Sequence, residues 1–429
     1  MIATRMALAL QPQATISAIG LSGQMHGVVL VNSDGKPLRP AILWPDARAQ
    51  DELKTYQALP APVRLRLANP LVPGMAGPIL AWVARQESDT YQAAASALQP
   101  KDWLRLRLTG ETATDPSDAS ATLLYDLLAD EWAEDVLVIL GLKRELFAAI
   151  RPSDATGGGL SKFAAEAMNL PAGIPVAIGA GDTAAAAVGT GLLEPGQIQV
   201  TMGTGAQVIQ LYREPLADPN GRVHLYRSAD RDTWYGMAAV QNGGLALDWV
   251  RRALGTHWEE LYACAERAAP GTEGLVFLPF LVHERAHQPN SQAGGAFLGL
   301  RSSHRREDML QAALEGVALG IRVALEALPG AEMATSLRVA WGGSVNQLWR
   351  QMLANVLGRQ LVAVDVPGAS SRGAALLGRV ASGKWATVRE TAKVVPPTQT
   401  VAIPDPKKVE LYDKVFAKYL KLTQVRQEG

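Results

Sequence analysis

The stretch Pro175-Val-Ala-Ile-Gly-Ala-Gly-Asp-Thr-Ala-Ala-Ala-Ala-Val188 carries the pattern from which the fold can be inferred. It starts with a short continuous apolar run, which is typical of a buried strand. Two glycines follow, and Asp182 then begins an alanine-rich segment that favours a helix. A strand that passes through a glycine turn into a helix is typical of α/β proteins, whose ligands bind at the carboxyl ends of strands.

The same passage from a strand into a glycine turn recurs along the chain, at Gly23, at Gly203-Thr204-Gly205 and at Gly342-Gly343-Ser344. Residues 48–150 and 307–328 have helical spacing, and a further helix is predicted over 347–357. Because Glu194-Pro195-Gly196 interrupts the pattern, we predict an α/β chain of two domains, 1–195 and 196–429, which flank a cleft.

Shorter elements are predicted around these turns. A helix is expected to end before Pro12, a hairpin to pair residues 28–31 with 41–44, and two short helices to span 118–135. Alternating or continuous apolar runs predict strands over 197–202, 223–227, 234–240 and 337–341.

Composition narrows the class of protein. The 429 residues carry 41 Lys and Arg against 41 Asp and Glu, and 48% of them are hydrophobic. This balance of charge disfavours binding to nucleic acid or to an anionic membrane. The lone Cys264 cannot form an internal disulfide, and the sequence has neither a membrane-length apolar run nor a signal-peptide core. We therefore expect a cytoplasmic protein.

Asp182 is the most informative acid in the sequence. On spacing alone an N-cap role is favoured, because Asp at a helix start accepts hydrogen bonds from free amides. The glycines before it let a second group approach the backbone, and a carboxylate at the open end of a strand can take a proton from a substrate hydroxyl. The two roles are compatible.

Other candidate groups give weaker signals. The turns at Gly203 and Gly342 could hold phosphate on their amides, although neither has the sequence of a P-loop or of a dinucleotide-binding fingerprint. His26 lies between glycines after a predicted strand, where a ligand contact and a packing role are equally favoured. His283 and His287 have the spacing of a metal pair, but their loop-like surroundings lead us to reject a metal site.

Several stretches, in order along nearly the whole chain, resemble the FGGY family of carbohydrate kinases and its xylulokinase branch in particular. They are Gly20-Leu-Ser-Gly-Gln-Met-His-Gly27, Pro40-Ala-Ile-Leu-Trp-Pro-Asp-Ala-Arg48, Pro100-Lys-Asp-Trp-Leu-Arg-Leu-Arg-Leu-Thr-Gly110, Ala180-Gly-Asp-Thr-Ala-Ala-Ala-Ala-Val-Gly189, Phe277-Leu-Pro-Phe-Leu281, Gly295-Ala-Phe-Leu-Gly-Leu300 and Gly342-Gly-Ser344. The resemblance implies two domains of the ribonuclease-H/actin type, with ATP, Mg²⁺ and a sugar meeting in the cleft between them.

The resemblance also implies roles for residues of this chain. Asp182 matches the general base that deprotonates the sugar hydroxyl as it attacks the γ-phosphate. The residues that would hold the ketopentose are Met25, His26, Lys101, Asp102 and Thr183. The residues that would approach the phosphates or line the nucleotide are Gly203, Thr204, Gly244, Asp248, Trp249, Gly342, Gly343 and Asn346. The expected reaction is ATP-dependent phosphorylation of D-xylulose to D-xylulose 5-phosphate, with a homodimer as one option for the oligomeric state.

The sequence departs from the family pattern in two places. Kinases of this family begin with a strand that carries an Asp-x-Gly-Thr phosphate turn, which nothing here matches, so we expect the first β-hairpin unit of the fold to be missing. Ile79 also stands where lysine is usual. Three alternatives therefore stay open: a kinase of another ketopentose or of a sugar acid, a non-catalytic sugar-binding remnant, and, with least support, an actin-like or chaperone ATPase.

Overall fold

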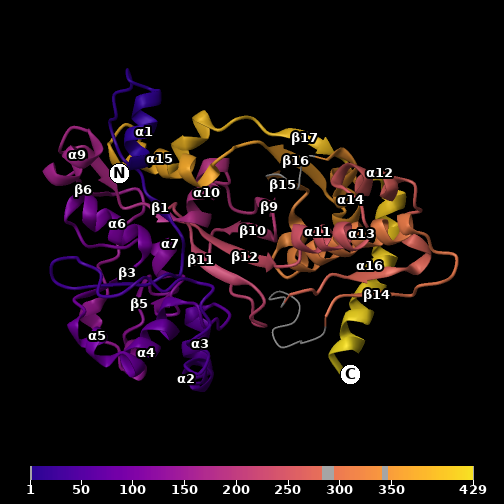
Figure 1. Cartoon of the computed structure of the whole chain (residues 1–429), viewed down its shortest axis with the longest axis horizontal. Helices are drawn as coiled ribbons and strands as arrows, with labels where there is room; N and C mark the ends of the chain where they lie inside the picture. Colours follow the sequence, from indigo (N-terminus) through magenta and orange to yellow (C-terminus); the bar gives the residue numbers. More distant parts are fainter. Residues whose placement is uncertain (1, 283–293, 341–345, 429) are drawn as a thin grey trace.

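The computed structural model describes residues 2–282, 294–340 and 346–428 (Figure 1). The predicted α/β composition is confirmed: a large sheet with its helices forms the second half, and short strand pairs lie among the helices of the first half. Within the described ranges, no helix is both long enough and apolar enough to span a membrane.

The large sheet has the strand order β11-β12-β10-β9-β15-β16-β17. Neighbours from β11 to β9 pair antiparallel, whereas β15 runs parallel to both β9 and β16. The four predicted strands of this half are found to within one residue as β9, β11, β12 and β15, and the sheet strands β10, β16 and β17 were not predicted. The bounds are β9 (Ile198–Met202), β10 (Ala206–Tyr212), β11 (His224–Arg227), β12 (Trp234–Val240), β15 (Ser336–Ala340), β16 (Gln360–Val364) and β17 (Gln399–Ala402).

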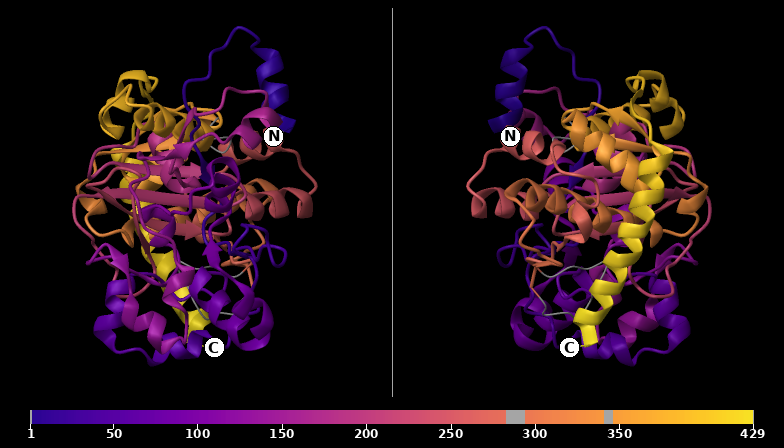
Figure 2. Two further views of the ribbon diagram at one scale, coloured as in Figure 1. Left: turned by 90° about the vertical axis from the view of Figure 1, so that its left-hand side faces the viewer. Right: turned by 90° about the vertical axis from the view of Figure 1, so that its right-hand side faces the viewer.

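The core of the second half is built around the long helix α13 (Arg306–Glu326). Leu310, Leu314, Val317 and Ile321 recur at helical spacing and are all buried, so the helix predicted over 307–328 is confirmed. The elements packed around the sheet and α13 are α11 (Gly244–Ala253), α12 (Trp258–Glu266), β13 (Val276–Leu278), β14 (Ala296–Leu298), α14 (Gln347–Leu357) and α16 (Pro406–Glu428). Figure 2 shows α16 running along the outside of this half toward the C-terminus.

The first half joins short strands to many helices. The strand pairs are β1 (Ser22–Gly23) with β8 (Ala180–Gly181), β2 (Val29–Val31) with β3 (Ser96–Leu98), β4 (Tyr125–Asp126) with β5 (Glu131–Trp132), and β6 (Thr156–Gly159) with β7 (Pro175–Ala177). The helices are α1 (Ile2–Leu10), α2 (Leu53–Ala58), α3 (Ala61–Leu67), α4 (Ala76–Gln86), α5 (Ser88–Ala93), α6 (Pro100–Thr109), α7 (Pro116–Ala119), α8 (Glu134–Ile139), α9 (Lys162–Met168) and α10 (Asp182–Thr190). The helix predicted to end before Pro12 is thus found as α1.

The prediction of two helices over residues 118–135 is wrong. After the short helix α7, the chain makes a tight hairpin from β4 to β5. The side chain of Asp126 accepts hydrogen bonds from the amides of Leu128 and Ala129, both at 3.0 Å, and Asp130 takes a left-handed φ of 60°. An Asp that bonds the amides ahead of it stabilises a turn at the expense of a helix.

The hairpin predicted for residues 28–31 and 41–44 is also largely wrong. Val28 and Ile42 do exchange backbone hydrogen bonds at 2.9 and 3.1 Å, but their pairing is an isolated bridge. The strand β2 pairs instead with β3, more than sixty residues away along the chain. This pairing brings the strand ahead of α6 alongside the segment that follows β1.

A helix from late in the sequence packs on the first half. The helix α15 (Ala369–Ala381) lies against α10, β1 and β7 (Figure 1). A Cβ at Gly189 would lie 1.9 Å from the Ala369 carbonyl oxygen, and one at Gly373 would lie 1.7 Å from that of Ala185. Glycine therefore allows the backbones of α10 and α15 to touch. The domain boundary at 195/196 stays a prediction, and α15 lies on the first-half side of the molecule.

Candidate active site

The carboxyl group of Asp182 stands where β8 passes into α10. Gly181 occupies the N-cap position, so Asp182 is the first residue of the helix itself and is not its cap. Its Oδ1 accepts hydrogen bonds from the Thr183 amide at 2.7 Å and from the Thr183 hydroxyl at 3.3 Å. Burial raises the pKa of Asp182 above its usual value, and the two bonds from Thr183 oppose the rise. The result is a half-buried carboxyl group at a helix start.

Met25 and His26 lie beside this strand end. A Cβ at Gly181 would come within 2.7 Å of the Met25 Cγ, which shows how closely the methionine covers the residue before Asp182. His26 has a left-handed φ of 70°, and its Nδ1 is 2.7 Å from the Ala121 carbonyl oxygen. A left-handed backbone conformation at a histidine costs free energy, and such strain is common at ligand sites. Met25 therefore lies against the residue that precedes Asp182, and His26 is its neighbour in the chain.

Aromatic side chains from the second half complete this region, and the sequence analysis did not identify them. The ring of Tyr226 lies 6.1 Å from that of His26 and 5.4 Å from that of Tyr235. The Tyr235 hydroxyl donates to the Met25 sulfur at 3.7 Å, and His224 stacks on Tyr226 at 5.5 Å. The alternating pattern locates strands β11 and β12, but it does not show which side chains face another domain.

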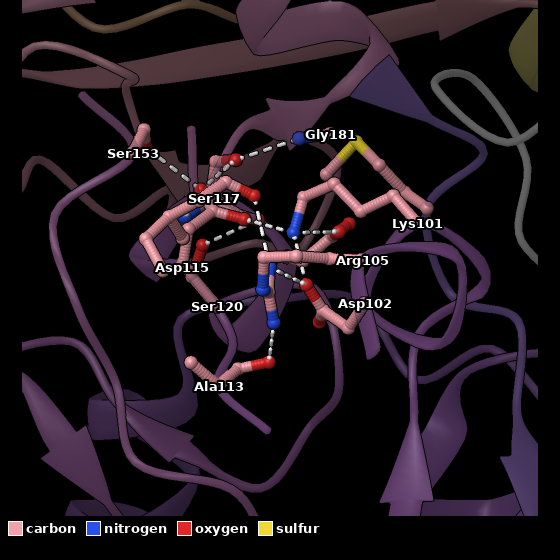
Figure 3. A network of polar contacts seen from close by, with 12 residues as sticks. Lys101, Asp102, Arg105, Ala113, Asp115, Ser117, Ser120, Ser153 and Gly181 are labelled. Atoms are coloured by element: carbon pink, nitrogen blue, oxygen red, sulfur yellow. Dashed lines mark hydrogen bonds and ion pairs between the residues drawn. The ribbon is translucent and has the colours of Figure 1, made fainter. Parts of the chain in front are cut away.

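Behind Met25 lies a fully buried cluster of charged groups (Figure 3). The Lys101 Nζ is 2.7 Å from an oxygen of Asp102, 2.8 Å from one of Asp115 and 3.1 Å from one of Asp118. Arg105 adds a bond of 2.8 Å to the same Asp102 oxygen and donates to the carbonyls of Ile178 and Ala113. We call Lys101, Asp102, Arg105, Asp115 and Asp118 the buried ion cluster.

Burial and the neighbouring charges shift the pKa values of Lys101 and Asp118 in this cluster. Burial works against the charge of Lys101, but the three carboxylates outweigh burial and raise its pKa, so the lysine stays charged. Burial raises the pKa of Asp118 well above its usual range, and the neighbouring carboxylates act in the same direction.

Lys101 and Asp102 are thus close to the site, but they cannot touch a ligand in this conformation. Both side chains have 0% exposure. A Cβ at Gly23, in the strand paired with Gly181, would lie 2.8 Å from the Lys101 Cβ. The two residues lie beneath the strand pair β1–β8, and the sugar contact implied for them stays a prediction.

The nucleotide-side prediction centres on the turn between β9 and β10. The carbonyls of Gly203 and Thr204 accept hydrogen bonds from the amides of Gly244 and Leu245, at 3.1 and 2.8 Å. A Cβ at Gly244 would lie 2.4 Å from the Gly203 oxygen, so glycine is required for the turn to sit on the start of α11. The structure brings Gly203, Thr204 and Gly244 together, and their contact with a nucleotide stays a prediction.

The remaining predicted nucleotide residues are more scattered. Trp249 is exposed on α11, and Asp248 pairs with Arg251 at 2.7 Å and with Arg252 at 3.0 Å. Asn346 caps α14 by accepting a hydrogen bond from the Trp349 amide at 3.1 Å. Gly342 and Gly343 lie outside the described residues, as do His283 and His287 of the rejected metal pair.

One strand connects the two groups of residues. Tyr235, near the start of β12, contacts Met25, and Val240, at the end of β12, pairs with Ala206 beside the glycine turn. At 3.4 Å per residue these two positions are about 17 Å apart along the strand. Residues predicted to bind the sugar and residues predicted to bind the nucleotide therefore lie near opposite ends of β12.

Comparison with known proteins places the chain in a family. The N-terminal domain of the FGGY family of carbohydrate kinases matches residues 3–189, and the C-terminal domain of that family matches residues 198–382. Xylulose kinase from Escherichia coli (strain K12) is 33% identical over 402 residues, which cover 92% of this chain and 82% of the relative. Gluconokinase from Bacillus subtilis (strain 168) is 29% identical over 87% of this chain and 76% of its own.

The fold is shared with solved sugar kinases. The crystal structure of a xyloylose kinase from Brucella ovis superposes with a TM-score of 0.92 at 33% identity, covering 99% of this chain and 88% of the other. The predicted pair of ribonuclease-H/actin-like domains is thereby confirmed. The chain is a sugar kinase, a phosphotransferase, and it belongs to the FGGY family of carbohydrate kinases.

Proposed function

We propose that the chain phosphorylates D-xylulose at its terminal hydroxyl with ATP, and that Asp182 is the general base. The similarity to xylulose kinases of three bacteria, at 29–33% identity over 81–94% of the chain, supports the substrate. The observation that carries the proposal is the position of the Asp182 carboxyl group at the start of α10, next to Met25 and with a raised pKa.

The chemistry asked of Asp182 is a single proton transfer. Within the described residues, the hydrogen bonds that this carboxylate accepts go to Oδ1, which leaves Oδ2 for a substrate hydroxyl. The hydroxyl proton moves to Asp182 while the sugar oxygen forms a bond to the γ-phosphorus, and the bond to the β-phosphate oxygen breaks to release ADP. A raised pKa makes the carboxylate a stronger base than an exposed aspartate.

The turn at Gly203 fits a phosphate group. A Cβ at Gly203 would meet no other atom within 4 Å, and both Gly203 and Thr204 are exposed, so this side of the turn has room for a ligand. Bound ATP supplies the γ-phosphoryl group, and Mg²⁺ neutralises charge on it with phosphate oxygens as ligands. The amide of Gly203 is already bonded to the Gly205 carbonyl at 2.8 Å, so the exposed Thr204 is the better candidate for contact.

A sugar acid is the second candidate, because the gluconokinase relative is nearly as similar as the xylulose kinases. A sugar acid would need a cation for its carboxylate. Lys101 and Arg105, the two cations of the buried ion cluster, are bonded to carboxylates, and Arg105 also to backbone carbonyls. Because these cations already have partners, they are poor ligands for a sugar carboxylate, which favours a neutral ketose as the substrate.

The test is release of ADP by the purified chain with ATP, Mg²⁺ and D-xylulose, with D-gluconate in a parallel assay. We expect turnover on D-xylulose, and a loss of several orders of magnitude in kcat for Asp182→Asn, which keeps the shape of the side chain and removes its basicity. The matched control is Asp413→Asn, which changes an exposed aspartate of α16 paired with Arg322 and should keep full activity.

Two outcomes would contradict the proposal. If the chain binds D-xylulose in calorimetry but releases no ADP, it is a sugar-binding protein without kinase activity. If Asp182→Asn retains activity, the base lies elsewhere. Faster turnover on D-gluconate would instead favour the sugar-acid candidate.

A further inference from the structure

A hydrogen-bonded bridge joins the buried ion cluster to the residue that precedes Asp182. The Gly181 amide donates to the Ser117 Oγ at 2.9 Å, and the Ser117 hydroxyl donates to the Asp115 Oδ2 at 2.5 Å (Figure 3). The other oxygen of Asp115 lies 2.8 Å from the Lys101 Nζ. Each of these side chains is buried.

We propose that Ser117 is a positioning residue for the Asp182 carboxylate: its hydroxyl fixes the backbone of Gly181, and through it the start of α10. This inference deepens the proposed function and rests on the role of Asp182 as base. Ser117 itself has no exposed surface and would not touch the sugar.

The available protons decide which group donates and which accepts in each hydrogen bond of this bridge. A serine hydroxyl has one proton to donate, and a carboxylate can only accept, so the Ser117 proton points to Asp115. The lone pairs of Ser117 are then available to the Gly181 amide. Asp115 is held on its other side by Lys101, and it accepts a bond from the Ser117 amide at 2.9 Å, which caps α7. The hydroxyl therefore has a fixed place.

Gly181 is confined on the remaining sides as well. A Cβ at this position would lie 2.7 Å from the Met25 Cγ and 3.1 Å from an oxygen of Asp118. In register, Gly181 pairs with Gly23 of β1, which lies against Lys101. Loss of the Ser117 hydroxyl would leave the buried amide without its partner, so the backbone would shift to find one. Asp182 is the next residue and would shift with it.

Ser153 provides a matched control. Its hydroxyl donates to the same oxygen of Asp115, at 2.8 Å, and it is buried like Ser117. The bond from the Gly179 amide goes to the backbone carbonyl of Ser153, so Ser153→Ala keeps it. Ser117→Ala and Ser153→Ala therefore remove one donor each from Asp115, and the first also removes the acceptor of the Gly181 amide.

The first experiment compares the kinetics of the two variants. We expect Ser117→Ala to lower kcat about 10- to 100-fold with little change in the KM for D-xylulose, because a displacement of about 1 Å is enough for such a loss. The kcat of Ser153→Ala should stay within about two- to threefold of the wild-type value. Its unfolding midpoint should fall about as much as that of Ser117→Ala. Equal kinetic effects of both variants, or an unchanged kcat in Ser117→Ala, would overturn the proposal.

A second measurement does not depend on turnover. NMR of protein labelled with ¹⁵N-glycine reports hydrogen exchange at the Gly181 amide, and ¹³C-labelled aspartate reports the titration of Asp182, which is assigned with Asp182→Asn. We expect faster exchange and an altered Asp182 titration in Ser117→Ala, and partial recovery in Ser117→Cys, whose thiol keeps the volume and is a weak acceptor. Neither readout should change in Ser153→Ala.

The titration is interpreted against the other ionisable groups around Gly181, which are Asp115, Asp118, Lys101 and Tyr235. If the wild type shows no kinase activity, the proposed function fails, and the NMR comparison still decides whether Ser117 positions Asp182. If Ser117→Ala leaves the exchange and the titration as they are in the wild type, the positioning role is wrong even in an active enzyme.

Discussion

The two halves of the molecule bury different kinds of side chain. Beneath β1 and β8 the first half buries three carboxylates and two cations, and every one of them bonds to another member or to a backbone group. The core around α13 buries mostly apolar side chains, together with the acid Glu315. Apolar packing tolerates small displacements, whereas buried ions need fixed partners. The first half has an apolar core of its own, but the region beneath Asp182 depends on directional bonds, whereas the core around α13 depends mainly on buried area.

The largest effect on stability is expected from Lys101→Met. The methionine approximates the volume of the lysine but leaves Asp102 and Asp115 without their shared cation, which should cost about 3–5 kcal/mol of unfolding free energy. Urea denaturation measures the loss. The control is Lys54→Met, which breaks the exposed pair with Asp51 and should leave the free energy of unfolding almost unchanged. Equal losses would show that the buried ion cluster is not a structural requirement.

The next effect concerns the crossing of α10 and α15. Gly373→Ala places a Cβ against the Ala185 carbonyl, so the helices must separate, at a cost of about 1–3 kcal/mol and with a fall in kcat. Gly320→Ala, within α13, is the matched change in the other half, where the nearest atom would be the Tyr419 Oη at 3.8 Å. Gly320→Ala should raise the free energy of unfolding by about 0.5–1 kcal/mol, because alanine favours a helix. Thermal unfolding and kcat of both variants test the contrast.

Glu315 should make the second half sensitive to pH. Burial raises the pKa of Glu315 to about 7 from its ordinary value of 4.5, although the Gly271 amide, Gln311 and the Tyr412 hydroxyl all bond to it. Between pH 4.5 and about 7 the folded state holds a proton that the unfolded state has lost, so the contribution of Glu315 to stability is greatest below pH 4.5 and is lost as the pH rises through about 7. In Glu315→Gln the fall in unfolding midpoint between pH 5 and 8 should be smaller. An identical pH dependence would mean that another group is responsible.

The smallest effect is expected at two helix caps. Asn346→Ala removes the acceptor of the Trp349 amide, and Ser161→Ala removes the acceptor of the Ala164 amide at the start of α9. Each substitution should lower the free energy of unfolding by about 1 kcal/mol. If Asn346 also lines the nucleotide, then Asn346→Ala raises the KM for ATP and Ser161→Ala does not. An unchanged KM would limit Asn346 to its capping role.

Local sequence signals were sufficient for much of the fold. The helix over 347–357 is found with the predicted bounds, because Asn346 caps its start and the left-handed Gly358 ends it. Asp182 is located for a similar reason, since a strand, two glycines and an alanine run lie next to one another in the sequence. The hairpin over 125–132 was missed because the turn depends on the single side chain of Asp126.

The buried ion cluster could not be read from the sequence in the same way. Its members come from α6 and from the segment around α7, and Ser153 and Gly181 join it from two further segments. A lysine followed by an aspartate has the pattern of an exposed helix start, and only the tertiary fold shows that both are buried. The contact of Tyr235 with Met25 likewise depends on how the two halves meet.

The packing of α15 on α10 also has a consequence for synthesis of the chain on the ribosome. The helix that begins with Asp182 ends at Thr190, and its packing partner begins at Ala369, about 180 residues later. At 5–20 residues per second, roughly 10–35 s pass before that partner is made. During this interval the apolar face of α10 has no native cover from α15. The packing around α10 is therefore completed only when most of the second half has been synthesised.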